Sequence, residues 1–239
     1  MRDAEHLDLP PPFELIKLRE VGDAFAAACA QARERGAGAL FLVGRFDLAE
    51  LALVLEPEEP LVLARRTAFY TGMLALTDAL SALAPPEKPI AIIWPDGIAV
   101  DGAVVGGGQL AWPQGAGEGA VPDWLVFGAT IRTVSMSDRE PGLRPLVTAL
   151  EEEGFRDADP ERLAAGFARH FMVQADRWRE RGFAPLARDY ANWLDRRPGR
   201  FSIDENGDLL IREDDGRQSR KAFLPAIETP SWREAASGG

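Results

Sequence analysis

Cysteine and histidine are scarce: the 239 residues include one cysteine and two histidines. Cys29 has no second thiol in the chain with which to form a disulfide, and it lies among alanines in a helical pattern. His6 and His170 are far apart in the sequence, so a zinc site is not expected. His170 has no ligand or base at a useful spacing, and we interpret it as a partly buried structural histidine.

Basic residues are outnumbered, with 27 Lys and Arg against 38 Asp and Glu, a formal charge of -11 and a pI near 4.8. Such a surface repels phosphate backbones and anionic lipids, so neither nucleic acid nor a membrane is an expected partner. No apolar run approaches the roughly 18 residues of a membrane span, and the first residues lack the basic and apolar regions of a signal peptide. These absences predict a cytoplasmic protein.

Common phosphate-binding and nucleophile motifs are also missing. The chain contains neither a Gly-x-x-x-x-Gly-Lys-Ser/Thr pattern nor a Gly-x-Ser-x-Gly frame. The glycines at 106–108 and 115–119 do not fit the Gly-x-Gly-x-x-Gly spacing, and we interpret 115–120 as a flexible loop. A P-loop or Rossmann protein is therefore not expected.

Glycine is plentiful inside one stretch that is patterned as β-strands, residues 90–132. Gly106, Gly107 and Gly108 have strand-like residues on both sides, and Gly128 lies within the last apolar run of the stretch. A glycine inside a strand weakens it, and the usual compensation is that a ligand or another backbone comes close. We therefore interpret residues 90–132 as the floor of a pocket.

Three polar side chains are placed where they could serve such a pocket. Arg45 precedes a tight turn and carries a planar guanidinium that suits a carboxylate or phosphate. Asp96 lies where a predicted strand reverses, and Arg132 ends the last glycine-bearing strand. For each of them a surface ion pair or a turn role is the alternative.

Hydrophobic periodicity predicts the surrounding elements. Strands are expected at 13–18, 39–43, 51–55, 90–93, 103–110 and 124–132, and helices at 23–36, 60–83, 161–181 and 183–195. After Pro198-Gly199 the pattern changes to a hairpin around Asn206-Gly207, with a further strand at 221–224. We expect a main domain over 1–197, a small β unit over 198–228 and a flexible tail over 229–239.

Three landmarks occur in order: Ile93-Trp94-Pro95-Asp96-Gly97, then Gly106-Gly107-Gly108-Gln109-Leu110, then Gly128-Ala129-Thr130-Ile131-Arg132. They resemble the Lys-Trp-Pro-Asn-Asp, Gly-Gly-Ile-Leu and Gly-x-Gly-x-Asn segments of the biotin protein ligase and lipoate protein ligase family. Residues 199–210 are similar to a hairpin of the SH3-like barrel in bacterial biotin ligases. The resemblance implies an α+β fold, a mixed β-sheet flanked by helices like that of class II aminoacyl-tRNA synthetases and biotin ligases, with a small C-terminal SH3-like unit.

The same resemblance implies a chemistry. Members activate biotin or lipoate with ATP and pass the acyl group to an acceptor domain, so the implied partners are a small carboxylic acid and a biotinyl or lipoyl acceptor domain. The implied ligand-binding residues are Arg45, Trp94, Asp96, Gly106, Gly107, Gly108, Gly128, Thr130 and Arg132.

The chain departs from the family at its charged positions. Ile93 stands where the family has the lysine before Trp-Pro, and Ala103-Val104-Val105 supplies no second lysine. Residues 44–47 replace a longer glycine- and arginine-rich loop, and 21–23 replace a Ser-Thr-Asn. Because an acyl-adenylate needs cations around its phosphate, we predict a ligase-like protein that binds a biotin-like or lipoate-like acid, with Arg45 as anchor, and lacks the usual adenylation machinery.

Two other interpretations stay open. The chain could be a non-enzymatic binding or regulatory module built on the ligase fold. It could also be a divergent acyl ligase or transferase, in which Arg132 or Lys88 replaces a missing lysine or Cys29 serves as a nucleophile. Lys88 lies on the far side of Pro89, and Cys29 lies in an alanine-rich helical face, which makes both poorly suited to these roles.

Overall fold

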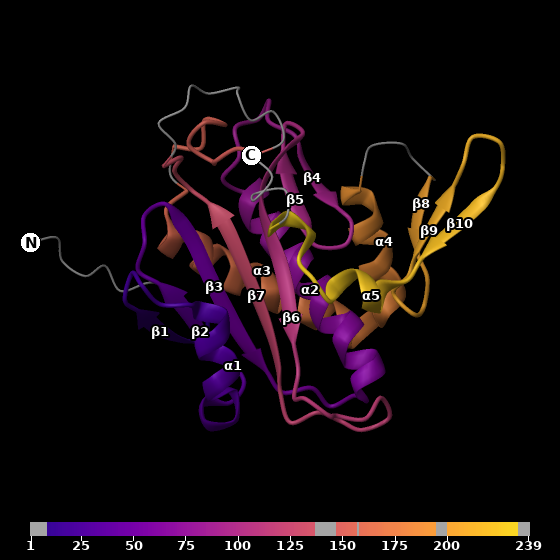
Figure 1. The fold of residues 1–239 in the computed structure, drawn as a ribbon, viewed down its shortest axis with the longest axis horizontal. Coiled ribbons are helices and arrows are strands. Elements are labelled where there is room, and N and C mark those ends of the chain that lie inside the picture. Colours follow the sequence, from indigo (N-terminus) through magenta and orange to yellow (C-terminus); the bar gives the residue numbers. More distant parts are fainter. Residues whose placement is uncertain (1–8, 137–146, 157, 195–199, 234–239) are drawn as a thin grey trace, which may run out of the picture.

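A computed structural model of the chain describes residues 9–136, 147–156, 158–194 and 200–233. Within them, a mixed sheet runs in the order β1-β2-β3-β7-β6-β5-β4 (Figure 1). β1 and β2 pair in parallel, and the other neighbours pair antiparallel. The strands are β1 (Glu14–Leu18), β2 (Ala39–Val43), β3 (Leu48–Leu55), β4 (Ile90–Ile93), β5 (Gly97–Val100), β6 (Ala103–Ala111) and β7 (Leu125–Arg132).

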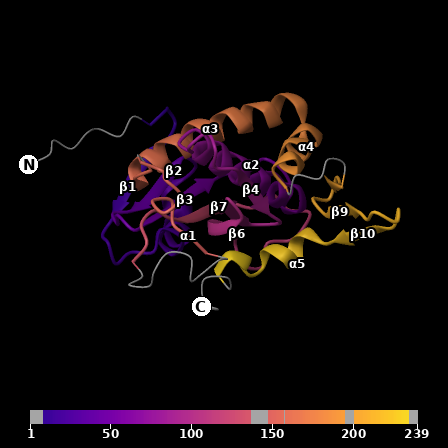
Figure 2. The ribbon, with the colours of Figure 1, turned by 90° about the horizontal axis from the view of Figure 1, so that it is seen from above.

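Helices cover both faces of this sheet, as the view from above makes clear (Figure 2). One face packs against α2 (Leu61–Ser81), α3 (Pro160–Arg181) and α4 (Phe183–Trp193). The opposite face carries α1 (Ala24–Arg35), which lies over β2, β3 and β7. We call these the helix-rich face and the α1 face.

Helix α1 begins and ends as its sequence predicts. The side chain of Asp23 accepts a hydrogen bond from the Ala26 N–H at 2.8 Å, and Gly36 ends the helix at a φ of 74°. Ala24, Ala28 and Ala32 form its buried stripe. Because these side chains are small, the helix approaches the sheet closely.

Aromatic rings fill the core beneath the helix-rich face. The rings of Phe127 on β7 and Phe167 on α3 stack with centroids 5.7 Å apart, and Phe69 of α2 meets Phe127 edge-on. Asp159 caps α3, and Pro160 occupies its first turn. Among the described residues, no helix is both long and apolar enough to cross a bilayer.

A second, three-stranded sheet follows the main domain, in the order β10-β9-β8. Its elements are β8 (Phe201–Ile203), β9 (Leu209–Arg212) and β10 (Gln218–Lys221), followed by α5 (Phe223–Ile227). The strand expected at 221–224 is therefore wrong. The Asp208 side chain accepts a hydrogen bond from the Phe223 N–H, and the Phe223 ring stacks on Tyr70 of α2, so the chain turns into a helix there.

The predicted α+β fold, a mixed sheet flanked by helices with a small C-terminal β unit, is confirmed. Two details differ from expectation: β5 is an additional strand, and β3 begins earlier, at Leu48. The predicted domain boundary near 197 lies outside the described residues. Residues 229–233 of the expected tail are described, and among them Trp232 is buried against the sheet and Ser231 bonds to Asp96.

Candidate functional site

Strand register brings three of the predicted pocket residues, Gly107, Gly128 and Thr130, together on the α1 face. Gly107 of β6 lies opposite Thr130 of β7, and Thr130 lies opposite Glu50 of β3. Two residues along, Gln109 lies opposite Gly128. Since alternate residues of a strand share a face, these positions line one patch of the sheet, next to the N-terminus of α1.

Aromatic side chains of the protein itself lie on this patch. A Cβ atom at Gly107 would come within 2.4 Å of Trp232 Cδ1, and one at Gly128 within 2.4 Å of Phe25 Cδ2. The two glycines therefore permit close contact, as their position in strands predicted. The close neighbours are the rings of Trp232 and Phe25 and, at Gly107, the backbone carbonyl oxygen of Asp96, 2.0 Å from the same Cβ position.

The other two glycines of the triplet have structural roles. Gly106 has a φ of 153°, and a Cβ there would lie 1.9 Å from the Thr130 carbonyl oxygen, so the residue allows β6 to approach β7 closely. Gly108 faces α2, where a Cβ would lie 2.6 Å from the Met73 sulfur. Only Gly107 of the triplet belongs to the patch.

Asp96 is buried at the edge of this patch, with 1% of its surface exposed. Its carboxylate accepts hydrogen bonds from the backbone N–H of Ser231, at 2.8 Å, and from the Ser231 hydroxyl. Burial raises the pKa of Asp96, and the bonds from Ser231 act in the opposite direction. The predicted site residue Asp96 is thus present at the patch and is bound by the C-terminal segment.

Glu50 supplies a second carboxylate to the patch. It accepts a hydrogen bond from the backbone N–H of Ala24 at 2.7 Å, which fixes the start of α1 against β3. Burial raises the pKa of Glu50, while the guanidinium groups of Arg45 and Arg233 lower it. Two carboxylates on one small patch oppose the binding of an anion unless these arginines compensate.

Arg45 and Arg132 lie near the same end of the sheet. The Arg45 guanidinium donates to both carboxylate oxygens of Asp47, at 3.0 and 2.6 Å, and this pairing raises the pKa of Arg45. A carboxylate ligand at Arg45 must therefore compete with Asp47. Arg132 shares the strand face of Gly128 and Thr130 and lies opposite Leu48.

Trp94 is not brought to this patch. It packs on the helix-rich side, where its Nε1–H donates to the Tyr70 hydroxyl at 3.2 Å. The Tyr70 hydroxyl in turn donates to the Gly207 carbonyl at 2.6 Å. Trp94 thus belongs to the junction with the C-terminal hairpin.

The residues considered as replacements for the family's chemistry are engaged elsewhere. Lys88 pairs with Asp101 and Glu153 at 3.0 and 2.8 Å. Burial, together with the nearby Asp23, raises the pKa of Cys29 to about 11, so its thiolate is rare at neutral pH. Ile93, which stands where the family has a lysine, is 44% exposed. Within the described segments, no cluster of three or more His, Cys, Asp and Glu is arranged to hold a metal.

Several residues of the patch were not predicted from the sequence: Phe25, Glu50, Gln109, Ser231, Trp232 and Arg233. Two of them carried a signal. Gln109 is a polar residue inside an apolar strand, and Trp232 is a large aromatic residue in a polar tail. The contacts of Trp232 with Gly107 and Gly108 depend on the return of the chain to the sheet after α5, which no local sequence pattern predicted.

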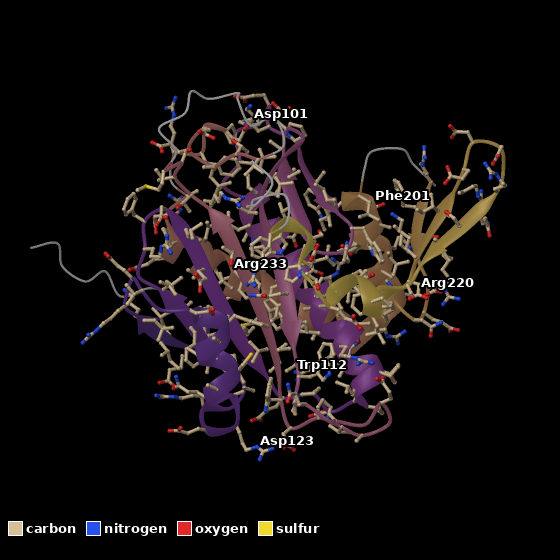
Figure 3. The ribbon with its side chains drawn as sticks, in the orientation of Figure 1. Asp101, Trp112, Asp123, Phe201, Arg220 and Arg233 are labelled. Atoms are coloured by element: carbon tan, nitrogen blue, oxygen red, sulfur yellow. The ribbon has the colours of Figure 1, made fainter. Side chains whose placement is uncertain are left out.

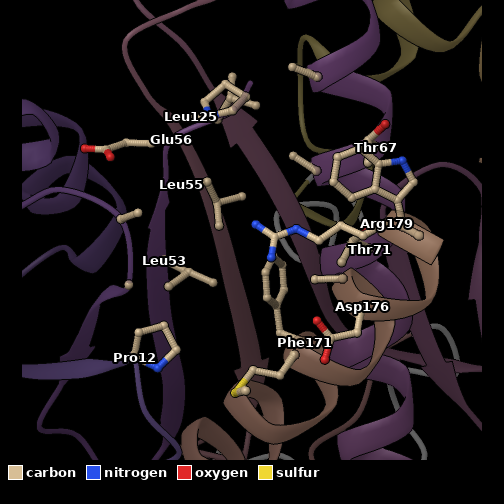
Figure 4. Close-up of a pocket in the computed structure, with 18 of the residues that line it drawn as sticks. Pro12, Leu53, Leu55, Glu56, Thr67, Thr71, Leu125, Phe171, Asp176 and Arg179 are labelled. Carbon is tan, nitrogen blue, oxygen red and sulfur yellow. The ribbon is translucent and has the colours of Figure 1, made fainter. Parts of the chain in front are cut away.

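A separate cavity of about 280 Å³ lies on the helix-rich side, between β3 and helices α2 and α3 (Figure 4). Its lining is mainly apolar, including Leu53, Leu55 and Phe171, with the hydroxyl of Thr71 among the polar groups. It contains none of the predicted site residues.

The fold is that of a biotin protein ligase. The sequence model of the Biotin/lipoate A/B protein ligase family matches residues 9–192. The biotin--[acetyl-CoA-carboxylase] ligase of Paracoccus denitrificans is 31% identical over 200 residues, covering 74% of this chain and 77% of that protein. The chain therefore belongs to the biotin/lipoate ligase family.

Solved structures agree with this assignment. A biotin protein ligase-like protein of unknown function from Silicibacter sp. TM1040 is 26% identical, with a TM-score of 0.76 covering 93% of this chain and 99% of that one. Biotin protein ligase from Aquifex aeolicus has the same fold at 17% identity, with a TM-score of 0.65 covering 88% and 99% of the two chains. It has also been solved in complex with biotin and ATP.

Proposed function

We propose that this protein binds a biotin-like or lipoate-like carboxylic acid on the α1 face of its sheet, without carrying out the family's usual adenylation. The observation that carries this proposal is the alignment of Gly107, Gly128 and Thr130 on one face beside the N-terminus of α1. A flat, glycine-lined floor accommodates a ring and an alkyl chain, and the nearby Arg45 and Arg132 offer guanidinium groups to a carboxylate.

The absence of adenylation follows from charge. Ile93 and the run 103–105 supply no lysine, and Glu50 and Asp96 place negative charge where an acyl-adenylate would bring more. Stabilising developing negative charge requires fixed cationic donors aimed at it. Binding of an acid, with little turnover of ATP, is the expected behaviour.

Calorimetry tests the binding step directly. The purified protein is titrated with biotin, lipoate and octanoate, and we expect at least one of them to bind. Asp47→Asn removes the negative charge that pairs with Arg45 and should tighten the binding of an acid, whereas Arg45→Ala should weaken it. Arg217→Ala, an exposed arginine on the C-terminal hairpin, is the matched control and should leave binding unchanged.

A second assay tests catalysis. Protein, ATP, biotin or lipoate and a biotinyl or lipoyl acceptor domain are incubated together, and adenylate and modified acceptor are measured by mass spectrometry. The proposal predicts traces only. Turnover comparable to that of an active family ligase would refute the non-adenylating assignment and favour a divergent ligase or transferase.

A non-enzymatic module with no small ligand is the second candidate. It is favoured by the rings of Phe25 and Trp232, which lie on the glycine floor. Thermal shift separates the two, because a ligand at 100 times its Kd stabilises a protein by about 2.7 kcal/mol. No response to any acid, with or without ATP, would favour the module.

A further inference from the structure

The C-terminal segment returns to the main sheet after the small β unit. Phe223 and Ile227 bury α5 against α2, and the chain then crosses the α1 face of the sheet (Figures 1 and 2). Arg233 lies over the middle of the sheet (Figure 3). The segment 231–233 thus occupies the face that carries the candidate ligand site.

Three consecutive residues of the segment bond to the patch. Ser231 donates to Asp96, and the Trp232 Nε1–H donates to the Gly108 carbonyl at 3.0 Å. Arg233 donates to the Gln109 side-chain oxygen at 3.0 Å. Asp96 lies at the edge of the patch, and Gly108 and Gln109 belong to β6, so these bonds hold the segment along β6.

The patch also matches this segment in shape and polarity. The Trp232 ring lies where any side chain at residue 107 would stand, and it is 6% exposed. Asp96 is a buried carboxylate, which is costly without donors, and Ser231 provides two of them. A ligand resting on Gly107 cannot coexist with the Trp232 ring.

Among residues 228–233, Trp232 alone is buried. Ser231 and Arg233 are exposed, as are Glu228 and Thr229 before them, and the segment joins no strand ladder of the described sheets. Release of the segment therefore leaves the backbone pairing of β6 with β5 and β7 intact. Such an attachment is suited to reversible opening.

We infer that Ser231–Arg233 is an intramolecular occupant of the candidate site, and that a ligand binds there only when this segment is displaced. The identity of the competing ligand rests on the proposed function, whereas the competition between segment and patch does not. Ser231–Arg233 thereby has a regulatory role, because any partner that captures the segment opens the site.

The first experiment tests recognition of the segment without any acid. A fluorescent peptide of residues 228–239 is titrated into the wild-type chain and into Trp232→Ala, with Trp193→Ala as a control that loses the same side chain on α4. We expect the peptide to bind Trp232→Ala at least tenfold more tightly than the other two. Equal or undetectable binding to all three overturns the inference.

The second experiment measures the acid that binds best to each variant. We expect at least tenfold tighter binding to Trp232→Ala than to the wild type, and a smaller gain for Arg233→Ala, whose exposed side chain is not needed for folding. Unchanged affinity, or weaker binding to both variants, overturns the inference and leaves the proposed function standing. If the peptide binds as expected but no variant binds an acid, the proposed function is overturned, and the conclusion that the segment occupies the patch stands.

Circular dichroism checks that each variant is folded. If Trp232→Ala is unfolded, the same binding measurements are made with Arg233→Ala and Ser231→Ala. Both change exposed side chains: the first removes the bond to Gln109, and the second removes the hydroxyl bond to Asp96. Gains in affinity for the peptide and the acid are then expected for both. Their absence in folded variants overturns the inference.

Discussion

The carboxylate of Asp96 accepts two hydrogen bonds from Ser231, a residue 135 positions further along the chain. Asp96 lies at the turn between β4 and β5, in the middle of the most family-like segment, and Ser231 lies at the end of the described chain. Their contact joins the predicted pocket floor to a part of the sequence that was expected to be a flexible tail. Ser231 is therefore in direct contact with a residue of the candidate site.

Replacing Asp96 by Asn should change how stability depends on pH. Burial raises the pKa of Asp96 in the folded state, so the folded protein binds a proton more readily than the unfolded chain. The wild type therefore loses stability as pH rises from the unfolded pKa, roughly 4, through the higher folded pKa. Asn does not titrate, and we expect Asp96→Asn to gain stability relative to the wild type over that window.

Urea unfolding of both proteins between pH 4 and 7 measures this difference. Glu50 titrates in both and cancels in the comparison. The prediction would be contradicted if the wild type became more stable relative to Asp96→Asn as pH rises. The hydrogen bonds from Ser231 to the ionised carboxylate would then lower the pKa of Asp96 by more than burial raises it.

Secondary-structure elements were predictable where the local sequence carried a capping residue or an apolar run. The caps of α1, Asp23 and Gly36, and the apolar runs of β2 and β7 marked their elements directly. β5, Gly97–Val100, was not among the expected strands. Sheet order was not accessible from periodicity, and the family resemblance supplied only the fold class, a mixed sheet flanked by helices.

Substituting Gly106 by Ala should destabilise the protein by about 3 kcal/mol or more, because the left-handed φ of 153° and the contact with the Thr130 carbonyl both exclude a Cβ. Gly117→Ala is the control: a Cβ atom there would meet no other described residue beyond its chain neighbours within 4 Å, so the free energy of unfolding should change little. Denaturant titration measures both. Equal effects at the two positions would contradict the structural role given to Gly106.

Substituting Tyr70 by Phe should loosen the junction with the small β unit. The hydroxyl that donates to the Gly207 carbonyl and accepts from Trp94 is lost, leaving buried partners unpaired at about 1–3 kcal/mol. Hydrogen exchange at residues 203–209 should accelerate. Tyr190→Phe, which loses a bond to the Pro95 carbonyl, is the control and should leave exchange in the hairpin unchanged.

Cys29 should react slowly with iodoacetamide. With a pKa of about 11, its thiolate fraction at pH 8 is about a thousandth, against about a quarter for an ordinary cysteine. Mass spectrometry should find alkylation more than a hundredfold slower than in the same protein unfolded in guanidinium. Rapid alkylation of the folded protein would restore Cys29 as a candidate nucleophile.

The candidate site was predictable only in part. Glycines in strands predicted close contact, and the register placed Gly107, Gly128 and Thr130 together. What touches them was not predictable, because Phe25 and Trp232 come from a helix and from the chain end. Trp94 was assigned to the pocket from its place in the motif, yet its indole points to Tyr70, an orientation that depends on packing against α2.

Thr71→Val should stabilise the protein by about 1 kcal/mol. Thr71 is 2% exposed and lines the cavity, and its buried hydroxyl has no hydrogen-bond partner among the described residues. A methyl group in its place removes the penalty of a buried, unpaired polar atom. Thr77→Val on the same helix is the matched control. Its hydroxyl donates to the Met73 carbonyl at 2.7 Å, and its loss should be neutral or destabilising by about 1 kcal/mol. Thermal and urea unfolding give both values, and a destabilised Thr71→Val would indicate that the cavity holds a polar partner for this hydroxyl.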